Sequence, residues 1–188
     1  MRIFIALDIP AEIRARITEY AARLRGYAPE ARWSRPEGLH VTLKFVGEVK
    51  DAKVEEIKGA LGGVKAAPFA VTFESAGFFP TPRSPRVFWI GVHADEALPQ
   101  LAAAIDNATH SAGIAKEERV FSPHLTLARA AQGGGGPQLR PLTPLLEAEA
   151  PPRFGTMTAR EFFLYQSQPQ RGGSKYTKLQ RFALGPEK

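Results

Sequence analysis

The chain has no cysteine among its 188 residues, which excludes a disulfide scaffold, a thiolate metal site and a cysteine nucleophile. It also lacks any run approaching the roughly 18 apolar residues that a membrane-spanning helix needs. The apolar start "MRIFIALDIP" is too short for a signal peptide and soon meets Asp8 and Pro10. We therefore expect a cytoplasmic protein without membrane association, whose chemistry relies on side chains other than thiols.

The charge balance favours a partner that carries many negative charges. There are 25 Lys and Arg residues against 19 Asp and Glu residues, a formal net charge of +6, and such an excess favours RNA, DNA or a nucleotide as partner. With 44% hydrophobic and 23% charged residues, the composition is otherwise that of a folded globular protein. We expect residues 1–188 to form one two-lobed domain that acts as a monomer.

Apolar periodicity predicts strands and helices along most of the chain. An apolar run at 2–7 indicates a buried strand, and apolar residues at helical spacing indicate a helix over 9–26 that ends at Gly26. The same reasoning predicts, in order, a strand at 39–47, a helix at 51–61 capped by Asp51, strands at 69–79 and 86–93 joined by a loop at 80–85, a helix at 95–113, a strand at 120–129, a flexible loop at 132–137, and closing strands at 160–167 and 176–184. This order is an α+β pattern.

Two segments of the chain share one motif. "HVTLKF" begins at His40 and "HLTLAR" begins at His124, 84 residues later, in a chain that has four histidines. Each half of the chain also carries a long amphipathic helix. The repeat predicts an α+β fold of two similar lobes, whose motif-bearing strands face each other across a groove.

Strand geometry explains why a His-x-Thr motif can be chemically active. Successive side chains of a strand point to opposite faces, so His40 and Thr42 share one face, as do His124 and Thr126. The alternate residues of the first motif then share the other face: Val41, Leu43 and Phe45. Each motif presents a proton-transfer group and a hydroxyl side by side.

Two such half-sites suit in-line displacement at a phosphorus atom. Histidine titrates near pH 6.5, so one imidazole can be neutral and act as a base while the other is protonated and acts as an acid. Each role typically contributes about 10² to 10⁴ in rate. The hydroxyls of Thr42 and Thr126 would bind the non-bridging phosphoryl oxygens. Spacing alone does not say which histidine is the acid.

Three further residues are candidates for the same site. Arg129 would point away from His124 in a regular strand, but it stands at the strand end, where the backbone can turn and bring its charge to the phosphate. Phe45 and Tyr176 are candidates for substrate binding, Tyr176 by stacking on a base or by a hydrogen bond to the phosphate. A surface role for Arg129 and a packing role for the two aromatic residues are the alternatives.

Other functions are compatible with parts of this pattern. A single His-x-Thr segment is more often a hydrogen-bonded structural histidine, although two matching copies argue against coincidence. A metallohydrolase would need more ligands, and the sequence has no His-Glu-x-x-His motif and no clustered aspartates. We therefore expect neither a metal nor another cofactor. A non-catalytic RNA-binding module is favoured by the charge alone.

The two motifs and their neighbouring segments resemble the two-histidine phosphoesterase superfamily, and more closely its RNA 2′,3′-cyclic phosphodiesterases, also called 2′-5′ RNA ligases. The similarity extends over most of the chain and includes "MRIFIALDIP", "RWSRPEGLHVTLKFVGEV", "RVFWIGV", "FSPHLTLAR" and "SKYTKLQRFAL". It implies a bilobal fold with antiparallel sheets that face a central groove and helices outside them.

The resemblance also implies a reaction. A terminal RNA 2′,3′-cyclic phosphate would be hydrolysed to a 2′-phosphomonoester, with His40 as the proton donor to the leaving 3′ oxygen and His124 as the proton acceptor that activates water. The same pair run backwards would join RNA ends through a 2′-5′ linkage. Within the superfamily, 2′-5′ oligoadenylates and ADP-ribose cyclic phosphate are alternative substrates.

Overall fold

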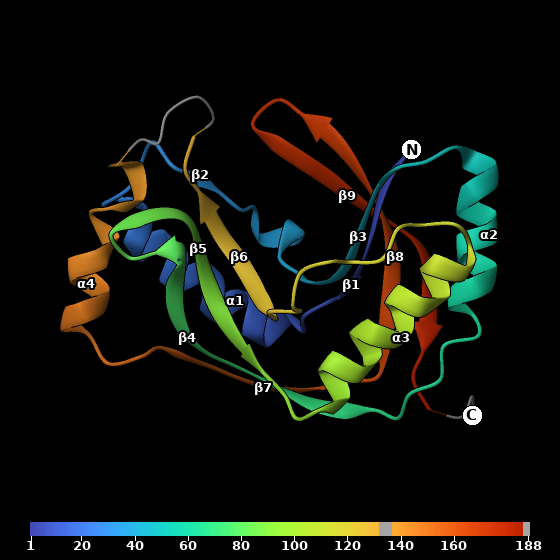
Figure 1. The fold of residues 1–188 in the computed structure, drawn as a ribbon. Coiled ribbons are helices and arrows are strands. Elements are labelled where there is room, and N and C mark those ends of the chain that lie inside the picture. Colours follow the sequence, from blue (N-terminus) through green and yellow to red (C-terminus); the bar gives the residue numbers. More distant parts are fainter. Residues whose placement is uncertain (132–136, 186–188) are drawn as a thin grey trace.

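The computed structural model describes residues 1–131 and 137–185, which form an α+β fold on two antiparallel sheets. Sheet A has four strands in the order β3-β1-β8-β9, and sheet B has five in the order β2-β6-β5-β4-β7. The elements in Figure 1 are β1 (Arg2–Leu7), α1 (Ala11–Arg25), β2 (Arg32–Trp33), η1 (Pro36–Gly38), β3 (Val41–Glu48), α2 (Asp51–Leu61), β4 (Phe69–Thr81), β5 (Ser84–His93), α3 (Ala97–Ser111), β6 (His124–Arg129), η2 (Pro137–Leu139), α4 (Leu142–Ala148), β7 (Arg153–Ala159), β8 (Glu161–Gln170) and β9 (Gly173–Ala183). The fold class expected from the sequence is confirmed.

The helices cover the sheets from outside (Figure 1). α2 and α3 pack against each other and α3 packs against β3 of sheet A, whereas α1 packs against β7 of sheet B. Tyr20 of α1 places its ring against those of Phe88 and Phe154. Buried apolar side chains of both sheets belong to one continuous core cluster. No helix in the two described ranges is long and apolar enough to cross a membrane.

The predicted loop at 80–85 is instead the end of a hairpin. β4 continues to Thr81 and β5 begins at Ser84, so only two residues form the turn. Pro80 pairs with Pro85 there, beyond the stretches of β4 and β5 that pair with β7 and β6. Prolines are accepted at this position because the hairpin end has no further strand that needs their amide protons.

Other departures from the expected pattern concern short elements. The segment after the second motif was expected to contain strands only, but it includes helix α4, whose seven residues are too few for a clear period. The two-residue strand β2 and the strand β7 were not predicted either. Lys50, not Asp51, occupies the N-cap position of α2, and Asp51 is its first helical residue. Of the loop predicted at 132–137, residues 132–136 lie outside the described part.

Both motif-bearing strands contain a β-bulge at the same position of the motif. In the β1–β3 ladder Ala6 pairs with Thr42 and the next residue, Ile5, pairs with Lys44, so Leu43 is an extra residue. In the β5–β6 ladder Trp89 pairs with Thr126 and Phe88 pairs with Ala128, so Leu127 is extra. A bulge reverses the alternation of side chains beyond it.

The first bulge corrects the predicted orientation of Phe45. Because Phe45 pairs with Phe4, it lies on the face of sheet A that carries Phe4, and not on the face of Leu43. Lys44 turns inward instead, where its Nζ lies 2.6 Å from the Asp106 carboxylate of α3 and also donates to the carbonyl of Ala115. The bulge thus exchanges the places of an aromatic ring and a lysine.

The second bulge likewise corrects the predicted orientation of Arg129. Arg129 pairs with Val87, two residues along β5 from the Trp89 that pairs with Thr126. Residues two apart on a regular strand share a face, so Arg129 lies on the same face of sheet B as Thr126 and His124. A defined irregularity inside the strand, and not a turn after its end, therefore brings Arg129 to this face.

Candidate active site

The strands that carry the two His-x-Thr motifs approach each other from different sheets. β3 is an edge strand of sheet A, β6 is the second strand of sheet B, and residues of the two strands are in contact. Figure 1 shows them near the centre of the molecule. His40 directly precedes β3 and His124 is the first residue of β6, so the fold brings together residues that are far apart in the sequence.

Both imidazoles are held by the same local hydrogen bond. Nδ1 of His40 lies 2.6 Å from the carbonyl oxygen of Gly38, and Nδ1 of His124 lies 2.8 Å from that of Ser122. A carbonyl oxygen can only accept, so Nδ1 donates its proton and the neutral ring keeps its lone pair on Nε2. The two rings are fixed in the same tautomer, and Nε2 is the nitrogen available for proton transfer.

Aromatic rings surround the imidazole of His40. The ring of Phe4 lies 4.7 Å away between centroids, Tyr165 lies 6.2 Å away, and Tyr176 meets the imidazole edge-on at 5.1 Å. Phe4 and Tyr165 stack on each other and form, with Ala6 and Phe163, an apolar cluster separate from the main core. This layer packs against the imidazole and shields part of it from water.

The imidazole of His124 has a different support. Phe79 meets it edge-on at 5.0 Å, and the ring of Phe79 lies 5.3 Å from that of Trp89. The indole of Trp89 lies over Gly77, where an added Cβ would stand 2.4 Å from the ring. Gly77 therefore makes the space for the aromatic pair that supports His124.

The threonines take the positions that strand alternation predicts. Thr42 Oγ1 lies 3.1 Å from Nε2 of His40, so hydroxyl and imidazole share one face. Thr126 and His124 pair with residues two apart on β5, Trp89 and Gly91, and so they too share a face. Each motif brings its histidine and threonine together as expected.

The surroundings lower the pKa of both histidines below the ordinary value. Burial is the main cause at each ring, and the positive charge of Arg129 contributes at both, although the hydrogen bond to a carbonyl works in the opposite direction. The carboxylate of Asp8 raises the pKa of His40 in part, and the charge of Arg14 lowers it. Because one guanidinium acts on both imidazoles, the three side chains share one electrostatic environment.

Asp8 is held as an anion by two cations. Its carboxylate lies 2.6 Å from Nη2 of Arg14 and 2.5 Å from Nζ of Lys178. Burial alone would raise the pKa of Asp8, but the hydrogen bonds from Lys178 and the Ile9 amide, with the two positive charges, outweigh burial and lower it. A negative charge is therefore fixed beside the first half-site at neutral pH.

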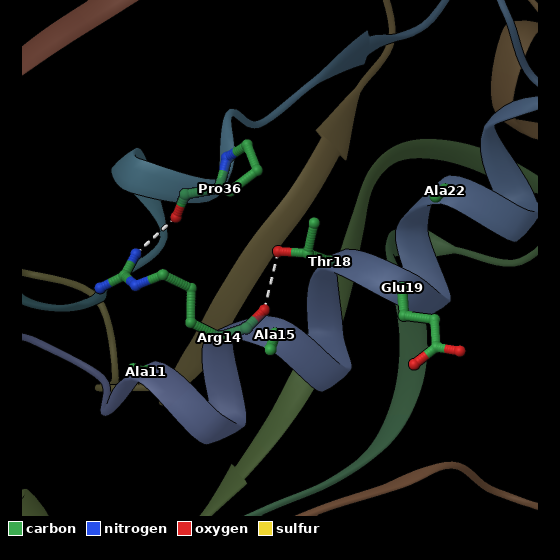
Figure 2. A pocket seen from close by; sticks show the side chains of 7 residues that line it. All are labelled: Ala11, Arg14, Ala15, Thr18, Glu19, Ala22 and Pro36. Carbon is green, nitrogen blue, oxygen red and sulfur yellow. Dashed lines mark hydrogen bonds between the residues drawn. The ribbon is translucent and has the colours of Figure 1, made fainter.

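Arg14 also ties α1 to the turn that leads into His40. Its guanidinium donates to the carbonyl oxygens of Pro36 and Leu39, and Leu39 directly precedes His40. Figure 2 shows this side chain reaching from α1 to Pro36. It lines an open pocket between the outer face of α1 and Pro36, to which neither His-x-Thr motif contributes. Arg14 fixes the backbone from which His40 projects.

The structure places the two aromatic candidates differently. Tyr176 of β9, 36% exposed, contacts the imidazole of His40 and the ring of Phe4. Phe45 is 49% exposed on the same face of sheet A, but the guanidinium of Arg2 lies over its ring at 5.1 Å. Tyr176 thus contacts the site directly, whereas Phe45 lies beyond Thr42 along β3.

Sequence reasoning missed several residues that shape the site. It took Phe4 only as part of a buried strand and Asp8 only as the end of an apolar run. The signal was present, because Phe4, Ala6 and Asp8 alternate along one face of β1 and its continuation. Tyr165 and Arg14 could not be found in this way, since they reach the site through tertiary packing.

Metal ligands are not gathered at this site. Within residues 1–131 and 137–185, no three His, Asp or Glu side chains are grouped so that they could hold a metal ion. The titratable groups at the two motifs are imidazoles, with one carboxylate and three cationic side chains around them.

Comparison with known proteins identifies the family. The model of the LigT-like phosphoesterases matches twice, over residues 7–89 and 90–176. Curated relatives named RNA 2′,3′-cyclic phosphodiesterase include one from Archaeoglobus fulgidus, 34% identical over 97% of this chain and 99% of its own length, and one from Escherichia coli, 34% identical over 97% and 96%. The crystal structure of E. coli LigT complexed with 3′-AMP superposes with a TM-score of 0.79 and 33% identity, covering 98% of each chain. The family expected from the sequence is confirmed, and the chain belongs to the LigT-like phosphoesterases.

Proposed function

We propose that this protein hydrolyses terminal RNA 2′,3′-cyclic phosphates to 2′-phosphomonoesters. The names of its full-length relatives support this substrate. The observation that carries the proposal is the matched pair of imidazoles: each is fixed through Nδ1 with Nε2 left for proton transfer, and the charge of Arg129 acts on both. A cyclic phosphate between the two motifs would meet an acid, a base and a cation.

In the proposed reaction His124 accepts a proton from water, and the oxygen of that water forms a bond to phosphorus. The bond between phosphorus and the 3′ oxygen breaks, and His40 gives its proton to that oxygen. This assignment is supported by Asp8, which favours the charged form of His40 and exerts no such effect on His124. A bound cyclic phosphate would raise the pKa of either ring, because it brings a negative charge.

The remaining candidates complete the phosphate site. The hydroxyls of Thr42 and Thr126 donate to non-bridging oxygens, and Arg129 neutralises the charge that these oxygens carry in the transition state. Tyr176, which stands edge-on to His40, contacts the terminal nucleoside, and Phe45 contacts substrate beyond Thr42. One chain supplies all of these groups, so the proposal includes a monomer as the active form.

The same constellation accounts for two further proposed properties. Proton transfer between imidazoles and the substrate needs no metal, so hydrolysis proceeds in EDTA. By microscopic reversibility, a 5′-hydroxyl in place of water attacks the cyclic phosphate and forms a 2′-5′ linkage.

The test uses an oligonucleotide with a 2′,3′-cyclic phosphate, incubated with protein in EDTA, followed by identification of the product isomer. The wild-type protein is expected to give a 2′-phosphate. His40→Ala and His124→Ala are each expected to lower kcat by about 10² to 10⁴. His110→Ala is the matched control, because His110 is an exposed residue at the end of α3.

Each alternative predicts a different result. A non-catalytic RNA-binding module would leave the substrate intact. A metal-dependent enzyme would lose activity in EDTA, and a 3′-phosphate product would contradict the assignment of the leaving oxygen.

A further inference from the structure

Two arginines oppose each other on the face of sheet B that carries the second motif. Arg32 of β2 pairs directly with Arg129 of β6. Directly opposed residues in an antiparallel ladder share a face, with Cβ atoms about 5 Å apart. Since Arg129 shares its face with Thr126 and His124, Arg32 does so too.

This pairing is unfavourable for the isolated protein. Like charges directly opposite each other destabilise a sheet. In the described ranges no carboxylate lies within ion-pair distance of either guanidinium, although Arg14, Arg23 and Arg181 all have one. Nη2 of Arg32 donates a long hydrogen bond, 3.4 Å, to the carbonyl oxygen of Ala130. Two adjacent cations without a counterion favour an anionic ligand at this edge.

The backbone under Arg32 is firmly held, although its side chain is exposed. The indole of Trp33 donates to the carbonyl oxygen of Ala28 at 2.8 Å and packs against Phe88. Ser34 donates through its hydroxyl to the carbonyl of Thr126 and through its amide to that of Leu127. The backbone that carries the Arg32 side chain is therefore fixed beside the second motif.

We infer that Arg32 binds the phosphodiester on the 5′ side of the terminal nucleotide, while Arg129 stays with the reacting cyclic phosphate. This subsite rests on the proposed function and extends it, because it makes the preferred substrate an RNA end with a chain attached. A nucleoside 2′,3′-cyclic phosphate without a 5′ phosphate leaves Arg32 without a ligand. A single 5′ phosphate supplies one.

The test compares three substrates with the same terminal base: a nucleoside 2′,3′-cyclic phosphate, the same compound with a 5′ phosphate, and a tetranucleotide with a 2′,3′-cyclic end. Arg32→Gln is expected to lower kcat/KM about tenfold for the two substrates with a 5′ phosphate and to leave the first unchanged, as befits the loss of one charged hydrogen bond. For the tetranucleotide, the plot of log kcat/KM against log salt concentration has a negative slope, and Arg32→Gln is expected to reduce the magnitude of that slope by about 0.7.

Two variants serve as controls. Arg32→Lys keeps the charge and is expected to retain most of the preference for a 5′ phosphate. Arg160→Gln removes an exposed arginine that directly precedes β8. The opposite end of β8 is the one near the segment that follows β2, because Arg35 donates to the carbonyl oxygen of Arg171 in the β8–β9 turn. This variant is expected to behave as wild type with all three substrates.

The possible outcomes separate the two proposals. If the wild-type protein opens none of the three cyclic phosphates, the proposed function fails. If it opens them but Arg32→Gln affects all three equally, or affects none, the subsite is overturned and the proposed function stands.

Discussion

The carboxylate of Asp8 lies close enough to the imidazole of His40 for its negative charge to raise the pKa of that ring, whereas burial and Arg129 alone lower the pKa of His124 against its carbonyl hydrogen bond. The two half-sites are therefore alike in the hydrogen bond that Nδ1 makes and unlike in charge. This asymmetry separates the two rings experimentally.

Substitution of Asp8 tests the asymmetry. Asp8→Asn removes the anion that favours protonated His40, so the pKa of His40 is expected to fall and that of His124 to stay where it is. An NMR titration of the imidazole resonances measures both. Equal displacement of the two pKa values would contradict the placement of Asp8 beside His40 alone.

The charge of Arg129 lowers the pKa of both imidazoles, so its removal is expected to change these pKa values in the direction opposite to the removal of Asp8. Arg129→Gln removes a positive charge, which favours the protonated form, so the pKa values of both His40 and His124 are expected to rise. The acidic limb of the pH–rate profile, where the base becomes protonated, then moves to higher pH. We expect kcat to fall about 10² to 10³, as when one charge-stabilising donor is removed. Unchanged pKa values with a lowered kcat would place Arg129 farther from the imidazoles.

The packing of Phe79 and Trp89 beside His124 depends on a glycine at position 77, because glycine has no Cβ. Gly77→Ala would drive a methyl group into the indole of Trp89, and such overpacking typically costs about 1 to 3 kcal/mol. Gly59 offers a matched control, because an added Cβ there meets nothing within 4 Å and the residue lies inside α2. Gly59→Ala is expected to stabilise the protein by about 0.4 to 1 kcal/mol. Urea denaturation measures both, and a stable Gly77→Ala protein would show that Trp89 can move freely.

The buried pair of Lys44 and Asp106 gives a prediction about stability. The side chain of Lys44 is 4% exposed and that of Asp106 is 19% exposed. Asp106→Ala leaves the ammonium buried without its partner and is expected to cost about 3 to 5 kcal/mol in the free energy of unfolding. Lys44→Met should cost less, because Asp106 keeps some contact with water and the amide of Glu117. The double variant should be more stable than Asp106→Ala alone, and a purely additive result in urea denaturation would argue against the ion pair.

The alternation of side chains along a strand predicts the orientation of the first three residues of each motif, but not of the residues after the bulge. It correctly pairs His40 with Thr42 and His124 with Thr126, since two residues of regular strand follow each histidine. It places Phe45 and Arg129 wrongly, because a bulge at Leu43 and at Leu127 reverses the faces. Bulges depend on pairing with the neighbouring strand, which a single sequence does not display.

The same limit applies to the surroundings of the site. Long elements such as α1, α3 and the β8–β9 hairpin follow from local pattern, because each has enough residues to show its period. The short β2 and α4 do not. The packing of Phe4 and Phe79 on the imidazoles, and the charge of Asp8 beside His40, arise from contacts between distant segments.

Neither sheet is the product of one half of the chain. Sheet A joins β1 and β3 to β8 and β9, sheet B joins β4 and β5 to β6 and β7, and α3 covers β3 although the chain reaches it after β5. An isolated half would carry only one of the two motif histidines, on an incomplete sheet whose apolar face the other half should cover. The two motif histidines thus come together only when both halves of the chain have folded into the same two sheets, and two separately made halves would have to associate before either imidazole could face the other.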